Sequence, residues 1–388
     1  MMQEISNDRI TLEKCFLSTI CYALNLSPLP KIDEQWDLSA LYDLAKRHAL
    51  VPMSAKAVRD GHFADVEAEL SLKFSQVQLA AIYHDEKLRY MQETAAKIFQ
   101  RENIPFVLLK GAVVRQFYPQ PWMRTRCDVD ILIHPEDVSR ALDALTASGF
   151  TTDRESHGHE VTLFLDDFPL ELHFTLRNNT PTMDKLMDQC WEYVQKKDGC
   201  EYLFTPEFFA FYEITHTCKH FLLGGCGVKS LIDLHLLRKN DYYEEEKLLP
   251  LLEECGLVKF YRSLCQLCDV WFGGEQYTEL TRSMEAFIFR GGSYGTADTK
   301  CMTLTAGQNG KWGRIRQMLF PAYEVVCKEN PAAEGKKLLR PYYYCHRIVT
   351  KVFGKNRALT KSHVHSVLDN DSTQLNRVRD LLSELEIK

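Results

Sequence analysis

An alternating run of apolar and polar residues at 128–133 predicts a buried β-strand. Three of its four apolar residues fall on one face: Val129, Ile131 and Ile133. Asp128 and Asp130 fall on the other face, because side chains two apart on a strand point the same way. Two carboxylates at the end of a core strand repel each other and lose hydration. A divalent cation would remove that penalty, so the pair is a candidate half of a metal site.

A second alternating run, at 169–174, supplies a third carboxylate. Glu171 and His173 share the face opposite the apolar residues, and a neighbouring strand would bring Glu171 within about 5 Å of the aspartates. Residues 160–165 predict a further strand, joined to this one by a hairpin-like link at 166–169. Each piece alone is more often a surface strand edge, but three carboxylates together form the oxygen-rich cage that Mg²⁺ prefers.

Upstream, residues 106–111 predict a buried strand that ends on a glycine and runs into a helix at 112–118. Such a turn brings backbone N–H groups and the positive end of a helix dipole toward a bound anion. Lys110, Arg124 and Arg126 add positive charge near the same edge, although each taken singly fits a solvated turn residue equally well.

The order of these motifs resembles the nucleotidyltransferase superfamily typified by DNA polymerase β. The order is a strand, Lys110-Gly111 and a helix, then arginines before Asp-x-Asp, then Glu-Leu-His-Phe. Within it, the chain resembles the bacterial family of uncharacterised nucleotidyltransferases. Three further segments are similar to that family's helical regions: 45–52, 216–237 and 320–321. The resemblance implies an α+β fold, with a polymerase β-like core of a small mixed sheet and flanking helices between two helical regions.

The resemblance also implies a role for each matching residue. Asp128 and Asp130 match the two metal-binding carboxylates, and Glu171 matches the third, which helps to activate the acceptor hydroxyl and is Asp in many members. Gly111 matches the glycine that approaches the triphosphate, whereas Lys110 stands where many members carry glycine. The implied ligands are an NTP, with ATP as the expected donor, and Mg²⁺, with Mn²⁺ as an alternative.

The rest of the chain reads as helices, at 12–24, 38–60 and 64–100 before the core and again after residue 181. We therefore expect an N-terminal helical region at 1–103, the αβ core at 104–180 and a C-terminal helical region at 181–388. The glycines at 223–227 predict a helix–helix turn, and residues 290–313 predict a loop. Further pocket candidates are His173, His216, His220 and Asp233.

Composition narrows the protein class. The net charge of −6 and the absence of a long basic stretch disfavour a nucleic-acid binder or a template-directed polymerase. No run approaches 18 apolar residues and no secretory signal is evident, so we expect no membrane span. The 13 cysteines follow no regular framework, and Cys265-x-x-Cys268 fits helix packing better than a metal site. A reducing, cytoplasmic setting is expected.

The leading hypothesis is a metal-dependent nucleotidyltransferase that moves a nucleoside monophosphate to a hydroxyl on a small molecule or a protein side chain. One alternative is an antitoxin-like regulator that acts on a partner protein. Another is a non-catalytic member of the fold that only binds nucleotide. The sequence leaves open the nucleotide base, the acceptor and the oligomeric state.

Overall fold

The computed structural model describes residues 2–30, 36–61, 68–152, 160–177, 181–305, 339–353 and 372–387, and positions 320, 323, 326, 327, 330, 333 and 336. The chain divides into two compact units. The first consists of residues 1–217 and 228–277, and the second of residues 218–227 and 278–388. The three-part division expected from the sequence, with boundaries near 103 and 180, remains a prediction.

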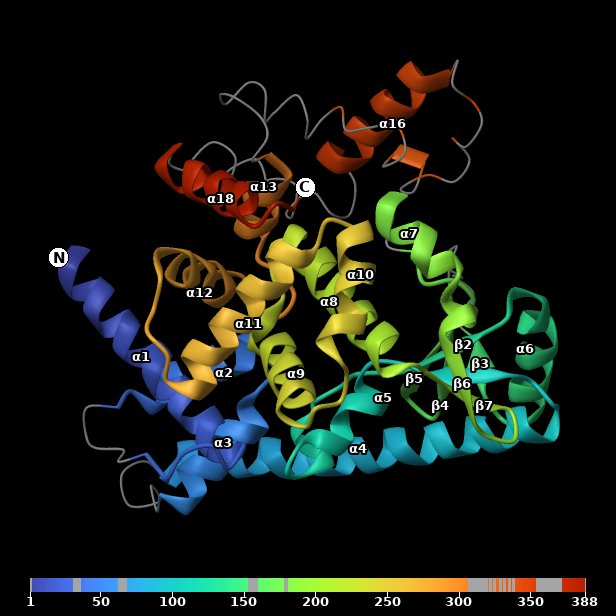
Figure 1. Ribbon diagram of the computed structural model, residues 1–388, viewed down its shortest axis with the longest axis horizontal. Helices are drawn as coiled ribbons and strands as arrows, with labels where there is room; N and C mark the ends of the chain where they lie inside the picture. Colours follow the sequence, from blue (N-terminus) through green and yellow to red (C-terminus); the bar gives the residue numbers. More distant parts are fainter. Residues whose placement is uncertain are drawn as a thin grey trace. The chain divides into compact units, whose positions relative to one another are not determined.

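The first unit is built on one seven-stranded mixed sheet, with strand order β3-β4-β5-β2-β1-β7-β6. Its strands are β1 (Phe106–Leu108), β2 (Val129–Ile133), β3 (Thr151–Thr152), β4 (Glu160–Leu165), β5 (Phe168–His173), β6 (Val194–Asp198) and β7 (Glu201–Phe204). At its centre β2 lies between β1, with which it is antiparallel, and β5, with which it is parallel. The expected α+β class, with a small mixed sheet and flanking helices, is confirmed (Figure 1).

Helices make up the rest of this unit. They are α1 (Met2–Ala23), α2 (Leu38–Arg47), α3 (Val51–Asp60), α4 (Ala68–Arg101), α5 (Gly111–Val114), α6 (Val138–Ala147), α7 (Pro181–Asp188), most of α8 (Pro206–Leu222), nearly all of α9 (Gly227–Lys239), α10 (Glu245–Glu254) and α11 (Val258–Gly273). The long α4 runs beneath the sheet in Figure 1. The core under the sheet joins α4 and α6 to alternate strand residues, among them Val129, Ile131, Ile133, Leu170 and Leu172. The alternation read from the sequence therefore assigns the correct strand faces.

Three details of this unit differ from the sequence expectation. The helix predicted at 38–60 is broken into α2 and α3, because Ala49 takes a positive φ of 55° and Pro52 lies in the first turn of the next helix. The link between β4 and β5 is only Asp166-Asp167, since Phe168 already pairs with Leu165. Strands β6 and β7 were not predicted, and they extend the sheet beyond residue 181.

The second unit contains α12 (Glu279–Gly291), α13 (Ala297–Thr305), α16 (Arg340–Phe353) and α18 (Ser372–Glu384), with α18 packed on α12 and α13. The glycines at 223–227 do form the expected link between helices. A Cβ on Gly291 would lie 2.3 Å from the Gly224 carbonyl oxygen, so these glycines allow two backbone segments to touch. The prediction of a loop at 290–313 is wrong for residues 297–305, which are helical. Residues 306–313 lie outside the described part of the chain.

Candidate active site

The register of two parallel strands brings the candidate carboxylates together. Asp130 on β2 is the direct partner of Glu171 on β5, and Leu132 is the partner of His173. Asp130 is 5% exposed, whereas the Glu171 side chain is 27% exposed. The predicted placement of the third carboxylate on a strand next to the Asp-x-Asp strand is thus confirmed.

Asp130 is held by two nitrogen donors on the same oxygen. Lys110 Nζ lies 2.8 Å and His173 Nε2 lies 2.9 Å from Asp130 Oδ1. Burial opposes the charged carboxylate, but Lys110 and His173 outweigh it and hold the pKa of Asp130 well below its ordinary value. Burial likewise opposes a charged Lys110, and the Asp130 carboxylate nevertheless raises the pKa of Lys110 well above its ordinary value.

His173 connects three carboxylates. Besides Asp130, its Nε2 lies 3.5 Å from Glu171 Oε2, and its Nδ1 lies 3.2 Å from Glu160 Oε2. Burial lowers the pKa of His173, but its bonds to Asp130 and Glu171 prevail and raise that pKa to about 9. Glu160 was not predicted as a site residue. Glu160 lies opposite His173 in the β4–β5 register because the hairpin turn has two residues, whereas the sequence predicted four.

Asp128 stands in a different electrostatic position. It is partly exposed, and within the described residues it forms no hydrogen bond or ion pair. Burial and the negative charges of Asp130 and Glu171 raise the pKa of Asp128 to about 6. The positive charges near Asp128 therefore do not offset its burial and the two neighbouring negative charges.

The donor set fits a hard divalent cation. One ligand atom from each of Asp130, Glu171 and His173 lies within 4.8 Å of the other two. Carboxylate oxygens are the ligands that Mg²⁺ and Mn²⁺ favour, and the uncompensated Asp128 carboxylate belongs to the same charge cluster. Metal binding by Asp128, Asp130 and Glu171 remains a prediction, and His173 contacts two of these residues.

The turn after β1 is built differently from the expected helix N-terminus. Lys110 has φ 45° and ψ −120°, and α5 is only four residues long before it tightens into a 3₁₀ turn at Arg115–Phe117. So short a helix adds little dipole to an anion site. A Cβ built on Gly111 would lie 3.5 Å from Arg124 Nη1 and 3.6 Å from Arg126 Cδ, which are ordinary contacts. The fold alone thus does not require glycine at 111.

Arg124 is fully engaged within the protein. Its Nε lies 2.8 Å from both carboxylate oxygens of Asp233, its Nη2 lies 2.7 Å from Asp233 Oδ2, and its Nη1 donates to the Thr125 carbonyl. The Tyr118 hydroxyl donates to the same carboxylate at 2.7 Å. This buried group fixes the loop that leads into Asp128. Contact between Arg124 and a phosphate remains a prediction.

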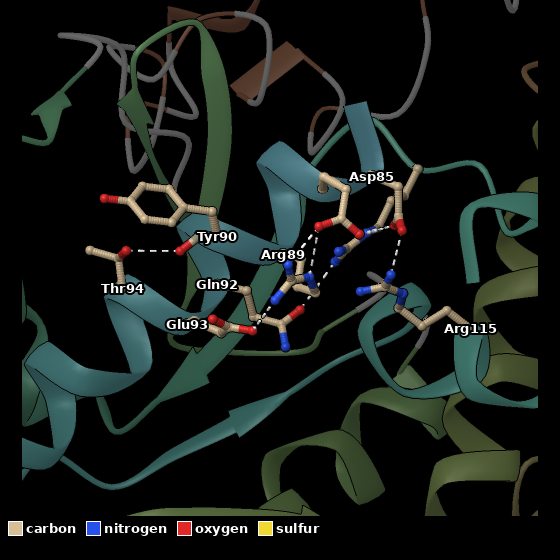
Figure 2. Close-up of polar contacts among 9 residues, drawn as sticks. Asp85, Arg89, Tyr90, Gln92, Glu93, Thr94 and Arg115 are labelled. Atoms are coloured by element: carbon tan, nitrogen blue, oxygen red, sulfur yellow. Dashed lines mark hydrogen bonds and ion pairs between the residues drawn. The ribbon is translucent and has the colours of Figure 1, made fainter. Parts of the chain in front are cut away.

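Arg126 has unused donors. Its Nη1 donates to Gln92 on α4, while its Nε lies 3.7 Å from Asp85 Oδ1, too far for a hydrogen bond. Figure 2 shows the Arg115 guanidinium directed at the same Asp85 carboxylate. Among the described residues, Arg126 Nε, Arg126 Nη2 and Arg115 Nε are buried without a hydrogen-bond acceptor. Burial and the neighbouring Arg115 charge lower the pKa of Arg126 to about 10.

Sequence reasoning missed Asp85 and Arg115. Asp85 occupies a buried position on α4, in the same helical phase as Phe74, Gln78 and Leu88. An acidic residue in the apolar stripe of a helix indicates a buried ion pair, and this signal was available in the sequence. The same signal marks Glu213 on α8, where burial and the Asp233 charge raise the pKa of Glu213 to about 7.

Lys229 on α9 was also missed. Its Nζ donates to the Thr125 carbonyl at 3.1 Å, so it supports the same loop as Arg124. Burial, followed by the Arg124 charge, lowers the pKa of Lys229 to about 8. The side chain is nevertheless partly exposed, and its charge acts on Asp128.

The histidines on α8 are less informative. His216 belongs to the first unit, and its ring centroid lies 6.3 Å from that of Tyr212. His220 belongs to the second unit. A pocket role for either histidine remains a prediction.

Comparison with known families identifies the protein class as a transferase of phosphorus-containing groups. A family model described as uncharacterised nucleotidyltransferase matches residues 34–273. That is more than half of the chain, so the chain belongs to this nucleotidyltransferase family. No curated protein and no solved structure matches the chain. Within the described residues, no helix has the length and apolar character needed to cross a bilayer.

Proposed function

We propose that this protein transfers a nucleoside monophosphate from an NTP, with ATP as the expected donor, to a hydroxyl group on a small molecule or a protein side chain. The observation that carries the proposal is the pairing of Asp130 with Glu171 across β2 and β5, with Asp128 two residues earlier. Mg²⁺, or Mn²⁺ in its place, is the expected cofactor. The cysteines of the described residues form no disulfide with one another, which fits a reducing cytoplasm as the place of action.

A divalent cation at these carboxylates would supply positive charge to the phosphate oxygens during transfer. The protein's own groups do the positioning. His173 fixes the orientation of Asp130. Glu171, which is more exposed, accepts the proton of the acceptor hydroxyl. In the transfer, the acceptor oxygen bonds to the α-phosphorus while the bond to pyrophosphate breaks.

Arg126 and Arg115 are the residues best suited to contact the phosphates. Buried guanidinium N–H groups without acceptors suit anionic oxygens, since charge-assisted hydrogen bonds are the strong ones. Gly111 lies next to Arg126, since a Cβ built on it would lie 3.6 Å from Arg126 Cδ. Lys110 supplies a further positive charge from the same turn. In this proposal Arg124 holds the loop in place.

The proposal is tested by incubating the protein with each labelled NTP, Mg²⁺ or Mn²⁺ and a cell extract. Label from the α-phosphate on a small molecule or on a protein supports transfer. Co-purification with one partner and no labelled product would favour the antitoxin-like alternative. Nucleotide binding without any labelled product would favour a non-catalytic member of the fold.

Replacing Gly111 by alanine should weaken nucleotide binding without weakening the fold. The added methyl meets only ordinary contacts in the protein, so the free energy of unfolding should change by less than about 0.5 kcal/mol. Next to Arg126 it would keep a phosphate oxygen from its donor, and the loss of one such bond weakens binding roughly 10-fold. Titration with ATP measures this effect. Gly273→Ala, at an open position, is the control, and equal affinities in the two variants would contradict the proposal.

Divalent-ion binding should weaken in mild acid. The raised pKa of Asp128, about 6, means that the folded protein protonates this ligand as the pH falls below about 6. A protonated carboxyl does not bind metal, so Mn²⁺ affinity should be level above pH 7 and fall roughly 10-fold for each pH unit below 6. Isothermal titration between pH 5 and 8 measures it. A level profile across this range would show that Asp128 is not a ligand.

A further inference from the structure

Lys110 places its ammonium group on a carboxylate of the proposed metal site. Its Nζ lies 2.8 Å from Asp130 Oδ1, and His173 Nε2 lies 2.9 Å from the same oxygen. A carboxylate oxygen has two lone pairs, so both acceptor positions of Oδ1 are taken. A cation bound to Oδ1 would have to displace one of the two donors.

Lys110 is the donor that can move. His173 is buried and is held from both ring nitrogens by Glu160, Glu171 and Asp130. Lys110 has a flexible four-carbon stem, its side chain is 20% exposed, and Asp130 is the only carboxylate within ion-pair distance of it among the described residues.

The backbone at Lys110 favours glycine. Its φ of 45° and ψ of −120° correspond to the first central position of a type II′ turn, where glycine is strongly preferred. Four of the other non-glycine residues with positive φ are Asn or Asp, which tolerate such values better: Asn25, Asn103, Asp166 and Asp241. A lysine at a position where glycine would be relaxed is therefore a reason to ask what the side chain does.

The charges at the site also favour displacement of Lys110 by a divalent cation. Asp128, Asp130 and Glu171 carry three negative charges, and the Lys110 ammonium offsets one of them. Protonated His173 offsets another, so these five groups have a net charge of −1 with Lys110 in place and −2 without it. Removal of the ammonium should therefore make the cluster a stronger ligand for a divalent cation.

We infer that Lys110 is a displaceable cation of this site. It neutralises Asp130 until a divalent cation binds there, and the released ammonium then reaches the phosphates of the nucleotide. This inference rests on the metal site in the proposed function. It makes Lys110 a competitor of the metal and a partner of the nucleotide at the same time.

The two roles predict effects of opposite sign for Lys110→Gly. This variant relaxes the turn and removes the ammonium, so Mn²⁺ alone should bind at least 10-fold more tightly, while ATP in the presence of saturating Mn²⁺ should bind more weakly. Lys110→Arg keeps the charge and should stay close to wild type for Mn²⁺. Lys110→Met removes the charge without changing to glycine, and should reproduce the Mn²⁺ result. Asp241→Gly, which relaxes another positive φ in the same unit, should change neither affinity.

Displacement itself is measured by amine acylation followed by mass spectrometry on the wild-type protein. Labelling of Lys110 should rise when Mn²⁺ is added. Lys56, which pairs with Asp60 at 3.0 Å, is the internal control and should not change. If Mn²⁺ binds but the labelling of Lys110 stays constant, or if Lys110→Gly and Lys110→Met bind Mn²⁺ no more tightly than wild type, the inference is wrong while the metal site stands. If the wild type binds no Mn²⁺, both fail.

Discussion

Asp130→Asn and Asp128→Asn should both abolish transfer, yet they should change the stability of the metal-free protein in opposite directions. Each loses a metal ligand, and ligation contributes several kcal/mol to the transition state, so we expect a fall in rate of about 10³-fold or more. Asp130→Asn also leaves Lys110 and His173 without their carboxylate and should cost about 3 kcal/mol of unfolding free energy.

Asp128→Asn should instead stabilise the protein. The folded state raises the pKa of Asp128 to about 6, so it disfavours the charged form. That penalty is absent below the unfolded pKa of about 4 and is complete above pH 6. At pH 7 the neutral amide should gain about 1–2 kcal/mol, a value reduced from the full shift because the group is partly exposed.

Urea unfolding at pH 7 with a chelator measures both variants, and a labelled-nucleotide assay measures the rates. The comparison of Asp128→Asn with the wild type at pH 4.5 is the control. Wild-type Asp128 is then protonated, so the stabilisation should be much smaller. Destabilisation of similar size in both variants at pH 7 would show that Asp128 is compensated by a cation in the free protein.

Asp233→Asn should destabilise the first unit by about 3–5 kcal/mol. Asp233 is 3% exposed and receives the Arg124 guanidinium and the Tyr118 hydroxyl. Removal of one partner from a buried ion pair leaves the other charge buried and unpaired. Because Arg124 fixes the loop that leads into Asp128, the transfer rate should fall as well.

The chain offers a matched exposed pair as a control. Arg238 on α9 and Asp269 on α11 pair at 2.9 Å with side chains 30% and 44% exposed. Asp269→Asn should cost less than about 1 kcal/mol. Equal losses of unfolding free energy in Asp233→Asn and Asp269→Asn would show that the Arg124–Asp233 pair does not hold the loop.

The sequence allowed prediction of the central strands and their acidic face because a strand has a period of two. Val129 and Leu170 mark the buried face wherever the register lies, and Asp130 and Glu171 follow on the other face. The direct pairing of these two carboxylates is more than the period alone predicts. It depends on the parallel pairing of β2 with β5, whereas the sequence predicted only that Glu171 lies on a neighbouring strand.

Other features lay beyond local patterns. Strand β6 is Val-Gln-Lys-Lys-Asp and mostly exposed, so it lacks the apolar alternation that predicts a strand. The partner of Arg124 lies 109 residues away, on a helix whose packing no local pattern reveals. The ion pair between Lys110 and Asp130 follows from a backbone turn that is typical of glycine, which a lysine in the sequence conceals.

The pairing of β2 with β5 has a consequence for the order of folding. The β4–β5 hairpin is local and can form early, since its two strands are joined by two residues. Asp130 and His173 are 43 residues apart, so they meet only after a large loop has closed. An early hairpin intermediate would carry Glu160, Glu171 and His173 without Asp130, and would assemble one half of the acidic cluster before the other half arrives. The repulsion between Asp130 and Glu171 therefore arises only after the nonlocal strand pairing has formed.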